Sequence, residues 1–157
     1  MKKAGIRSII VKKFRLTSSK ETIVERENLL ERNFTTQAIN EKWVGDITSI
    51  HTLRDGWCYL ASVMDLHTKK IVGYSFSRTM TTELITKALE NAYQTQKPSE
   101  GLIFHSDLGT QYTSDEFAKI IKEFKMTHSF SYKGSPYDNV CIEFFSFYFK
   151  ERRSKSR

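Results

Sequence analysis

The chain has few cysteines and no long apolar stretch, and both absences restrict what it can be. Only two of its 157 residues are cysteines, Cys58 and Cys141, and they lie far apart with no Cys-x-x-Cys pair. The four histidines also lack the paired spacing of a zinc site. No apolar run is long enough to span a membrane, and no signal peptide is recognisable. The sequence therefore predicts a cytoplasmic protein with reduced thiols and no membrane segment.

Charge is unevenly distributed along the chain, which carries +7 overall. Residues 1–20 contain seven Lys or Arg and no acid, and residues 150–157 contain five basic residues and one acid. The remaining 129 residues carry 13 basic and 17 acidic side chains, a balance of −4. A basic arm of this kind suits the phosphate backbone of DNA, which such contacts bind without reading sequence. A solvated, disordered tail explains the same composition equally well.

The pattern of apolar residues predicts one compact α/β core. Strand-type runs at 43–50, 57–64 and 71–76 are joined by short turns, as in an antiparallel meander. Helical and strand patterns then alternate: a helix capped by Thr81 or Thr82, a strand at 102–106, a helix that includes Phe117 and Phe124, and a strand near 127–130. This order predicts a mixed five-stranded sheet flanked by helices.

Three carboxylates stand where such a fold can bring them together. Asp46 lies inside the first strand run, Asp107 follows a later strand at a turn, and Glu143 lies just inside a helix expected after a loop. Ligands in open α/β sheets usually bind at strand ends, and clustered carboxylates can hold metal ions that act on phosphodiesters. The 35 residues between Asp107 and Glu143 are weak evidence alone, because chance places a Glu at a fixed offset from an Asp roughly 8% of the time.

Other acidic residues have simpler explanations. Asp65 ends the second strand run and could approach the same site, but a turn between two strands explains it better. Asp55 before Gly56 fits a hairpin turn. Asp115 follows Ser114 at the start of a helix, where an N-cap, a surface ion pair or a turn explains it.

Three further residues could assist the carboxylates. Asn139, four residues before Glu143, can cap that helix or orient its carboxylate. Lys150 lies seven residues after Glu143, close to two helical turns, so it should share the same face and could hold a phosphate. A solvated lysine near a helix C-terminus is the simpler alternative. His105, two residues before Asp107, fits either a group that supports that carboxylate or a packed strand histidine.

Four blocks of residues carry a resemblance to a known family. They are Trp43-Val-Gly-Asp46-Ile-Thr48, Asp65-Leu-His-Thr-Lys-Lys-Ile-Val-Gly73-Tyr, His105-Ser-Asp107-Leu-Gly109-Thr-Gln111-Tyr112 and Lys133-Gly-Ser-Pro136-Tyr-Asp138-Asn139-Val-Cys-Ile-Glu143. In order and spacing they resemble the catalytic domain of bacterial insertion-sequence transposases of the OrfB type. Those enzymes belong to the retroviral-integrase-like D, D, 35, E superfamily. The resemblance runs from about Asn28 to Glu151 and implies a ribonuclease-H-like fold.

The resemblance also implies a mechanism and partners. Asp46, Asp107 and Glu143 would hold two Mg²⁺ or Mn²⁺ ions in a polynucleotidyl transferase that cleaves DNA strands and transfers them. Lys150 and Lys133 would contact DNA. The family further implies element ends and target DNA as substrates and a separately encoded helix-turn-helix protein as partner. Uncovered aromatic side chains after Glu143 favour self-association.

The chain departs from the family pattern after Glu143. It stops 14 residues beyond that glutamate, and its last helix is unusually aromatic, so we expect a transposase truncated at its C-terminus. The predicted organisation is a basic arm over 1–39, a catalytic core over 40–151 and a basic tail over 152–157. A capping box at Ser18 to Glu21 allows a short helix from about 19 to 31. A DNA-binding remnant without catalysis and a structure-selective nuclease of the same fold remain alternatives.

Overall fold

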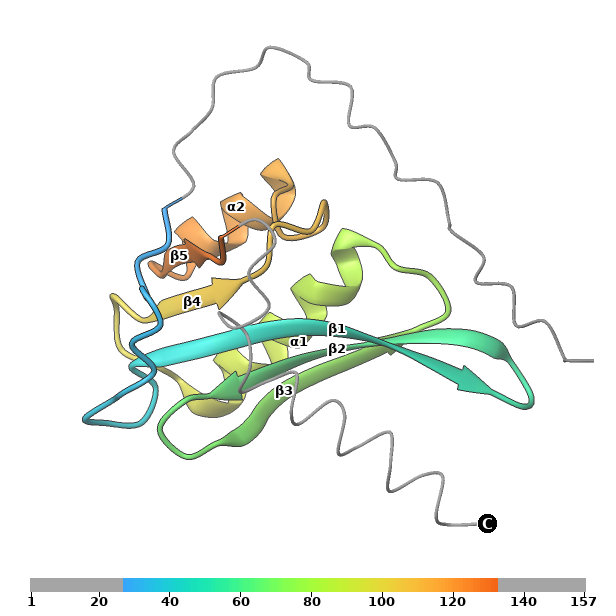
Figure 1. The fold of residues 1–157 in the computed structure, drawn as a ribbon, viewed down its shortest axis with the longest axis horizontal. Helices are drawn as coiled ribbons and strands as arrows, with labels where there is room; N and C mark the ends of the chain where they lie inside the picture. Colours follow the sequence, from blue (N-terminus) through green and yellow to red (C-terminus); the bar gives the residue numbers. More distant parts are fainter. Residues whose placement is uncertain (1–26, 133–157) are drawn as a thin grey trace, which may run out of the picture.

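The computed structural model describes residues 27–132, and residues 1–26 and 133–157 lie outside the described part. The elements in chain order are β1 (Lys42–Thr52), β2 (Gly56–Asp65), β3 (Lys70–Ser77), α1 (Thr82–Gln96), β4 (Ile103–Ser106), α2 (Asp115–Glu123) and β5 (Thr127–Phe130). The five strands form one sheet in the order β3-β2-β1-β4-β5 (Figure 1). The predicted fold, three antiparallel strands followed by alternating helices and strands, is confirmed.

The first three strands form the predicted meander. β1 and β2 pair in antiparallel register up to Thr52 and Gly56, so residues 53–55 form the loop, and Gly56 after it has a φ of 72°. β2 then turns into β3 around the buried Asp65, whose carboxylate accepts hydrogen bonds from the amide and the hydroxyl of Thr68, both at 2.9 Å. The turn role expected for Asp65 is therefore confirmed.

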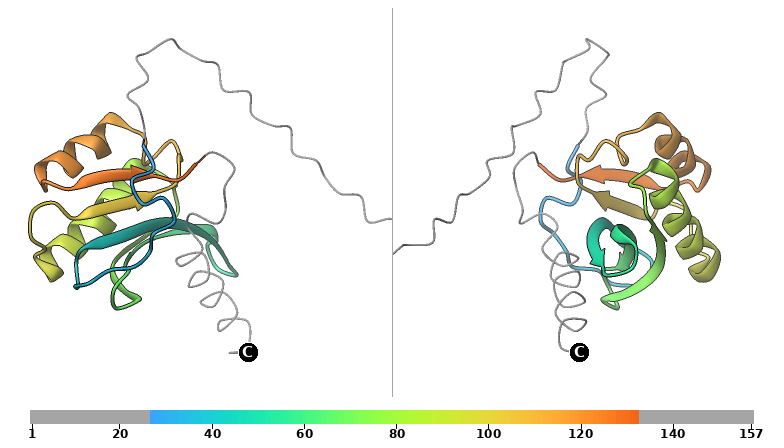
Figure 2. Two further views of the ribbon diagram at one scale, coloured as in Figure 1. Left: turned by 60° about the vertical axis from the view of Figure 1, so that its left-hand side comes forward. Right: turned by 90° about the vertical axis from the view of Figure 1, so that its right-hand side faces the viewer.

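The second half of the sheet is parallel. β4 pairs with β1, with Trp43 opposite Phe104 and Val44 opposite His105, and β5 pairs with β4 in the same direction. Helices α1 and α2 connect these strands and lie on one face of the sheet, which carries Trp43 and Phe104 and is called the helix face below (Figure 2). Within the described residues, neither helix is long and apolar enough to cross a membrane.

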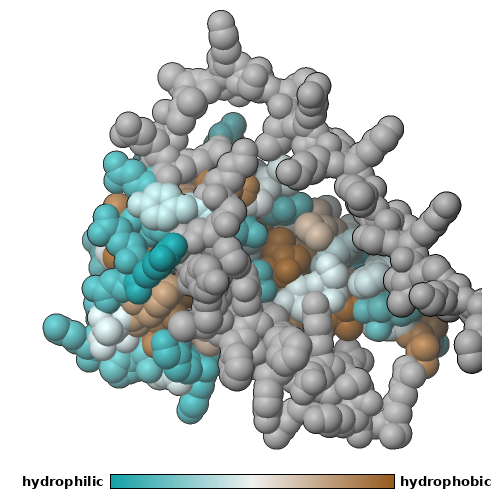
Figure 3. All heavy atoms as spheres, viewed as in Figure 1, coloured by the Kyte–Doolittle hydropathy of each residue, from teal (hydrophilic) through white to brown (hydrophobic). Residues whose placement is uncertain are grey.

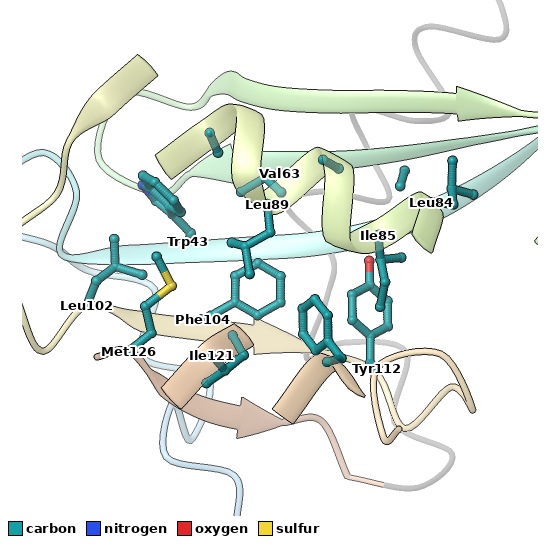
Figure 4. Packing of buried hydrophobic residues seen from close by; sticks show 14 residues of the cluster. Trp43, Val63, Leu84, Ile85, Leu89, Leu102, Phe104, Tyr112, Ile121 and Met126 are labelled. Atoms are coloured by element: carbon teal, nitrogen blue, oxygen red, sulfur yellow. The ribbon is translucent and has the colours of Figure 1, made fainter. Parts of the chain in front are cut away.

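The main core lies between the helix face and the two helices (Figure 4). Trp43, Phe104 and Phe117 are its largest fully buried side chains. Helix α1 contributes an apolar stripe whose members are Leu84, Ile85, Ala88, Leu89 and Ala92. Its N-cap is Thr81, although the Thr81 side chain makes no capping hydrogen bond, whereas Ser114 caps α2 by accepting from the Phe117 amide at 3.2 Å.

The opposite face of the sheet carries Val44, Met64 and His105 and is partly covered by residues 27–34, the N-terminal strap. Leu30 from the strap is buried against Val44 and Met64. Figure 3 views the molecule from this side, the strap face, and shows hydrophobic and hydrophilic residues interspersed over it. The strap and the helices thus hold the sheet from opposite sides (Figure 2).

The helix expected from about 19 to 31 does not reach the described residues, because 27–31 form bends and a turn. The hydroxyl oxygen of Ser129 on β5 accepts hydrogen bonds from the amides of Leu29 and Leu30, at 3.0 and 3.2 Å. These tertiary bonds, together with burial of the Leu30 side chain, replace the bonds that a helix would have supplied. The expectation is therefore wrong over 27–31, and the remainder of that helix lies outside the described residues.

Gly73 on β3 permits the close approach of α1, which leads to a first prediction. A Cβ on Gly73 would contact the Ala88 carbonyl oxygen and would lie 2.6 Å from both the amide nitrogen and the Cβ of Ala92. Since two of these atoms belong to the helix backbone, Gly73→Ala should lower the free energy of unfolding by about 3 kcal/mol. Urea denaturation measures this loss. Ser75→Ala, on the same strand, is the control, and an equal effect of the two substitutions would contradict the packing described.

Candidate active site

The parallel register of β1 and β4 brings two of the predicted carboxylates abreast. Val44 stands opposite His105, and Asp46 and Asp107 each follow two residues later along their strands. Because side chains alternate between the two faces of a strand, Asp46 shares the strap face with Val44. Adjacent strands lie about 4.8 Å apart, so continuing the register places Asp107, the first residue after β4, beside Asp46.

The two carboxylates have different surroundings. Asp46 is half-buried in the middle of β1 and accepts a hydrogen bond from the Thr48 hydroxyl at 3.3 Å. Asp107 is exposed, and its carboxylate accepts from the Gly109 amide at 2.8 Å, which fixes the turn that follows β4. One acid therefore lies on a strand and the other on a short turn that a hydrogen bond stabilises.

Tyr112 lies near both acids, and its sequence context did not indicate this position. The residue is 3% exposed and lies in the core among Phe104 and Phe117. Figure 4 shows its hydroxyl directed toward β1, where a Cβ on Gly45 would lie only 3.1 Å from the hydroxyl oxygen. Gly45 therefore leaves room for this side chain directly beside Asp46.

Both acids lie close enough to Tyr112 to affect the ionisation of its hydroxyl. Burial raises the pKa of the Tyr112 hydroxyl well above its usual value, and the negative charges of Asp46 and Asp107 raise it further. A single hydroxyl feels both charges, so the two carboxylates converge on one region. The hydroxyl stays protonated at neutral pH and adds no third negative charge there. The sequence alone did not indicate that Tyr112 lies beside the two acids, because most buried aromatic residues only fill the core.

His105 lies two residues before Asp107 in the sequence, and its side chain is fully buried. Its Nδ1 lies 2.8 Å from the Ser129 hydroxyl oxygen. The Ser129 oxygen already accepts from the Leu29 and Leu30 amides, which occupy both of its lone pairs, so its proton is directed to Nδ1. This arrangement assigns His105 Nδ1 as the acceptor of the Ser129 hydroxyl proton. The same hydroxyl thus joins the strap, β5 and the strand that leads to Asp107.

The other predicted site residues, Glu143, Lys150, Lys133 and Asn139, lie outside the described residues. Within residues 27–132, no three His, Cys, Asp or Glu side chains come together as a metal site. Asp46 and Asp107 supply carboxylate oxygens, the ligand type that Mg²⁺ and Mn²⁺ prefer. The donor set of this pair fits such an ion, and a third ligand from another part of the chain would complete it.

Comparisons with known proteins identify the family to which the chain belongs. The model of the integrase core domain family matches residues 36–136. The transposase InsF for insertion sequence IS3A of Escherichia coli strain K12 is 38% identical over 146 residues, covering 92% of this chain and 50% of that protein. An uncharacterized 31 kDa protein of insertion element IS600 from Shigella sonnei is 41% identical over 135 residues, covering 85% and 49%. The chain spans about half the length of the curated relatives it matches.

Solved structures support the fold. The HTLV-2 integrase catalytic core domain in complex with magnesium matches with a TM-score of 0.59 and 18% identity, covering 72% of this chain and 69% of that chain. The simian T-cell lymphotropic virus intasome in complex with the PP2A regulatory subunit B56 gamma matches with a TM-score of 0.62 and 18% identity, covering 69% and 37%. At this identity the likeness concerns the fold, which is that of an integrase catalytic core.

The raised pKa of Tyr112 predicts a pH effect on stability. Above pH 10.0, the ordinary pKa of tyrosine, the unfolded chain ionises this hydroxyl while the folded chain keeps it protonated. Wild type should therefore lose unfolding free energy relative to Tyr112→Phe, by about 1.4 kcal/mol per pH unit until the folded pKa is reached. Urea denaturation of both proteins at about pH 9 and about pH 11 measures the change. Parallel pH dependence in the two proteins would contradict a buried hydroxyl beside two carboxylates.

Proposed function

Because the chain belongs to the integrase core domain family, we propose that it cleaves DNA strands and transfers them in the transposition of an insertion sequence. The proposed catalytic residues are Asp46, Asp107 and Glu143. The observation that carries the proposal is the convergence of Asp46 and Asp107 beside the Tyr112 hydroxyl, on neighbouring parallel strands. The sequence similarity to the InsF transposase favours transposition over other reactions of DNA.

Asp46, Asp107 and Glu143 would hold two Mg²⁺ or Mn²⁺ ions, which when bound supply an activated water or 3′-hydroxyl and stabilise the leaving oxygen. The residues of the chain then have separate tasks. Asp46 gives a fixed carboxylate from the middle of a strand, and Thr48 donates a hydrogen bond to it at 3.3 Å. The Tyr112 ring closes the side of the site that faces the core and excludes water there.

The remaining residues are assigned to support and to DNA contact. Lys133 and Lys150 hold DNA phosphates, and Asn139 orients the Glu143 carboxylate. His105 fixes the end of β4 through its bond to Ser129, and thereby the position of Asp107. The reaction takes place in the bacterial cytoplasm, with element ends and target DNA as substrates. A second copy of the chain and a separately encoded helix-turn-helix protein are the expected partners.

A structure-selective nuclease of the same fold is the second candidate, because the same two carboxylates would serve strand hydrolysis. A strand-transfer assay with Mn²⁺ separates the two. A transposase joins the cleaved end to a second DNA molecule, whereas a nuclease releases the end. A chain that binds DNA but neither cuts nor joins it would contradict both.

Asp107→Asn tests the metal site directly. Asparagine keeps an oxygen that can accept from the Gly109 amide, and it removes a negative charge beside Asp46, so the metal-free variant should be as stable as wild type or slightly more so. Mn²⁺ at a hundredfold excess over Kd should raise the stability of wild type by about 2.7 kcal/mol. The variant should lose both this increase and DNA cleavage. Thermal melts with and without Mn²⁺ measure the difference.

Asp115→Asn is the matched control for this experiment. Asp115 is an exposed acid in the first turn of α2, away from β1, so its substitution should leave the metal-induced increase intact. Equal metal effects in wild type and Asp107→Asn would remove Asp107 from the site, and with it the main support for catalysis.

The basic arm gives an independent prediction about DNA affinity. Residues 1–20 carry seven basic side chains and no acid. Their removal should weaken binding to duplex DNA of arbitrary sequence and flatten the dependence of log affinity on log salt, because fewer counterions are released. Fluorescence anisotropy over a range of salt concentrations measures the slope. If the shortened protein keeps the same slope, the arm makes no contact with DNA phosphates.

A further inference from the structure

Two exposed aromatic side chains share the sheet face that carries Asp46. Across the meander, Asp46 stands opposite Ser62, and Ser62 stands opposite Tyr74 on β3. Two residues further along, Leu60 stands opposite Phe76. Residues directly opposite one another in antiparallel strands point to the same face, so Tyr74 and Phe76 lie on the strap face, in line with Asp46.

The two rings form a shelf that is open to solvent and firmly held. Tyr74 is 64% exposed and Phe76 is 52% exposed. They are two residues apart on an edge strand, so their Cα atoms lie about 7 Å apart. The strand beneath them is fixed to α1, because Asn91 donates a hydrogen bond to the Tyr74 carbonyl at 2.9 Å and Gly73 packs against the helix backbone. Exposed aromatic rings that lie together on a fixed strand are typical of an interaction site.

The charge around the shelf suits a nucleic acid. β3 contains no acidic residue, Lys69 and Lys70 stand at its beginning, and Arg78 follows its end. The Arg78 side chain is 73% exposed even though it pairs with Asp55. A strand whose bases stack on the rings would therefore have basic side chains at both ends of the shelf for its phosphates.

We propose that Tyr74 and Phe76 stack unpaired bases of the DNA strand whose scissile phosphate lies at Asp46 and Asp107. This inference rests on the proposed function. β3 is two strands away from β1, so Tyr74 lies about 10 Å from Asp46, a distance that a DNA strand covers in about three nucleotides. Rings can stack only on bases whose faces are free, so the shelf binds a DNA end that has opened next to the cleavage position.

Binding without metal tests the shelf apart from catalysis. The probes are a labelled oligothymidylate of about ten nucleotides and a blunt duplex of the same length, measured by fluorescence anisotropy in EDTA. Tyr74→Ala combined with Phe76→Ala should weaken binding of the single strand about tenfold or more and leave duplex binding nearly unchanged. Replacing both residues by Trp should restore the single-strand affinity, because stacking needs a ring and not a particular residue.

Trp57→Ala is the matched control. Trp57 is also an exposed aromatic residue, at 62%, but it pairs with His51, one residue out of phase with Ile50 and Cys58, and so lies on the other face of the hairpin. Its substitution should leave both affinities unchanged. Equal weakening by Trp57→Ala and by the double substitution would overturn the assignment, since any exposed ring would then serve.

Cleavage with Mn²⁺ supplies a second readout. The double substitution should impair cleavage of a blunt end, mainly through a higher KM, and a substrate already unpaired over its last three nucleotides should relieve part of the defect. The double variant could instead bind the single strand as tightly as wild type does and lose self-association in sedimentation. That result would assign the shelf to a second copy of the chain and overturn the proposal. Wild type could also fail to cleave any DNA while the double substitution still weakens binding of the single strand and not of the duplex. The proposed function would then be contradicted, whereas the binding of unpaired bases by the shelf would be supported.

Discussion

The parallel pairing of β1 with β4 is the contact on which the rest of the structure depends. It joins segments that lie far apart in the sequence, with Val44 opposite His105, and it alone sets Asp46 beside Asp107. Both faces of the sheet stabilise this pairing. On the helix face, Phe104 occupies the space beside Gly45 that a Cβ would fill. On the strap face, Leu30 packs against Val44, and the Ser129 hydroxyl ties the strap to the histidine of β4.

The sequence was sufficient to predict the helices and strands, because local signals are strong there. The meander follows from short turns such as Asp55-Gly56, and the two helices follow from apolar stripes of helical period. Asp107 could be placed at a strand end because an apolar run precedes it and Gly109 follows it. Asp65 could be assigned to a turn for the same reason, and its bonds to Thr68 agree.

Features that arise from contacts distant in sequence were not predictable in this way. The capping box before residue 22 suggested a helix toward residue 31. The Leu29 and Leu30 amides instead donate hydrogen bonds to the Ser129 hydroxyl oxygen, which is about 100 residues away in the sequence. In the sequence, Tyr112 is indistinguishable from other core aromatic residues. Its position near the acids depends on Gly45, where the absence of a Cβ leaves space for the Tyr112 hydroxyl. The shelf of Tyr74 and Phe76 was equally hidden, because only the pairing of β2 with both neighbours aligns these rings with Asp46. Local patterns specify elements, whereas the register between distant strands specifies the site.

The central claim is that Asp46 and Asp107 act together as ligands of a divalent metal ion. A crystal structure of the full chain grown with Mn²⁺ tests it most directly, because manganese is located by its anomalous scattering without reference to activity. An anomalous peak is expected within coordination distance of a carboxylate oxygen of both Asp46 and Asp107. A peak at other residues, or Asp46 and Asp107 turned away from one another with no peak between them, would contradict it.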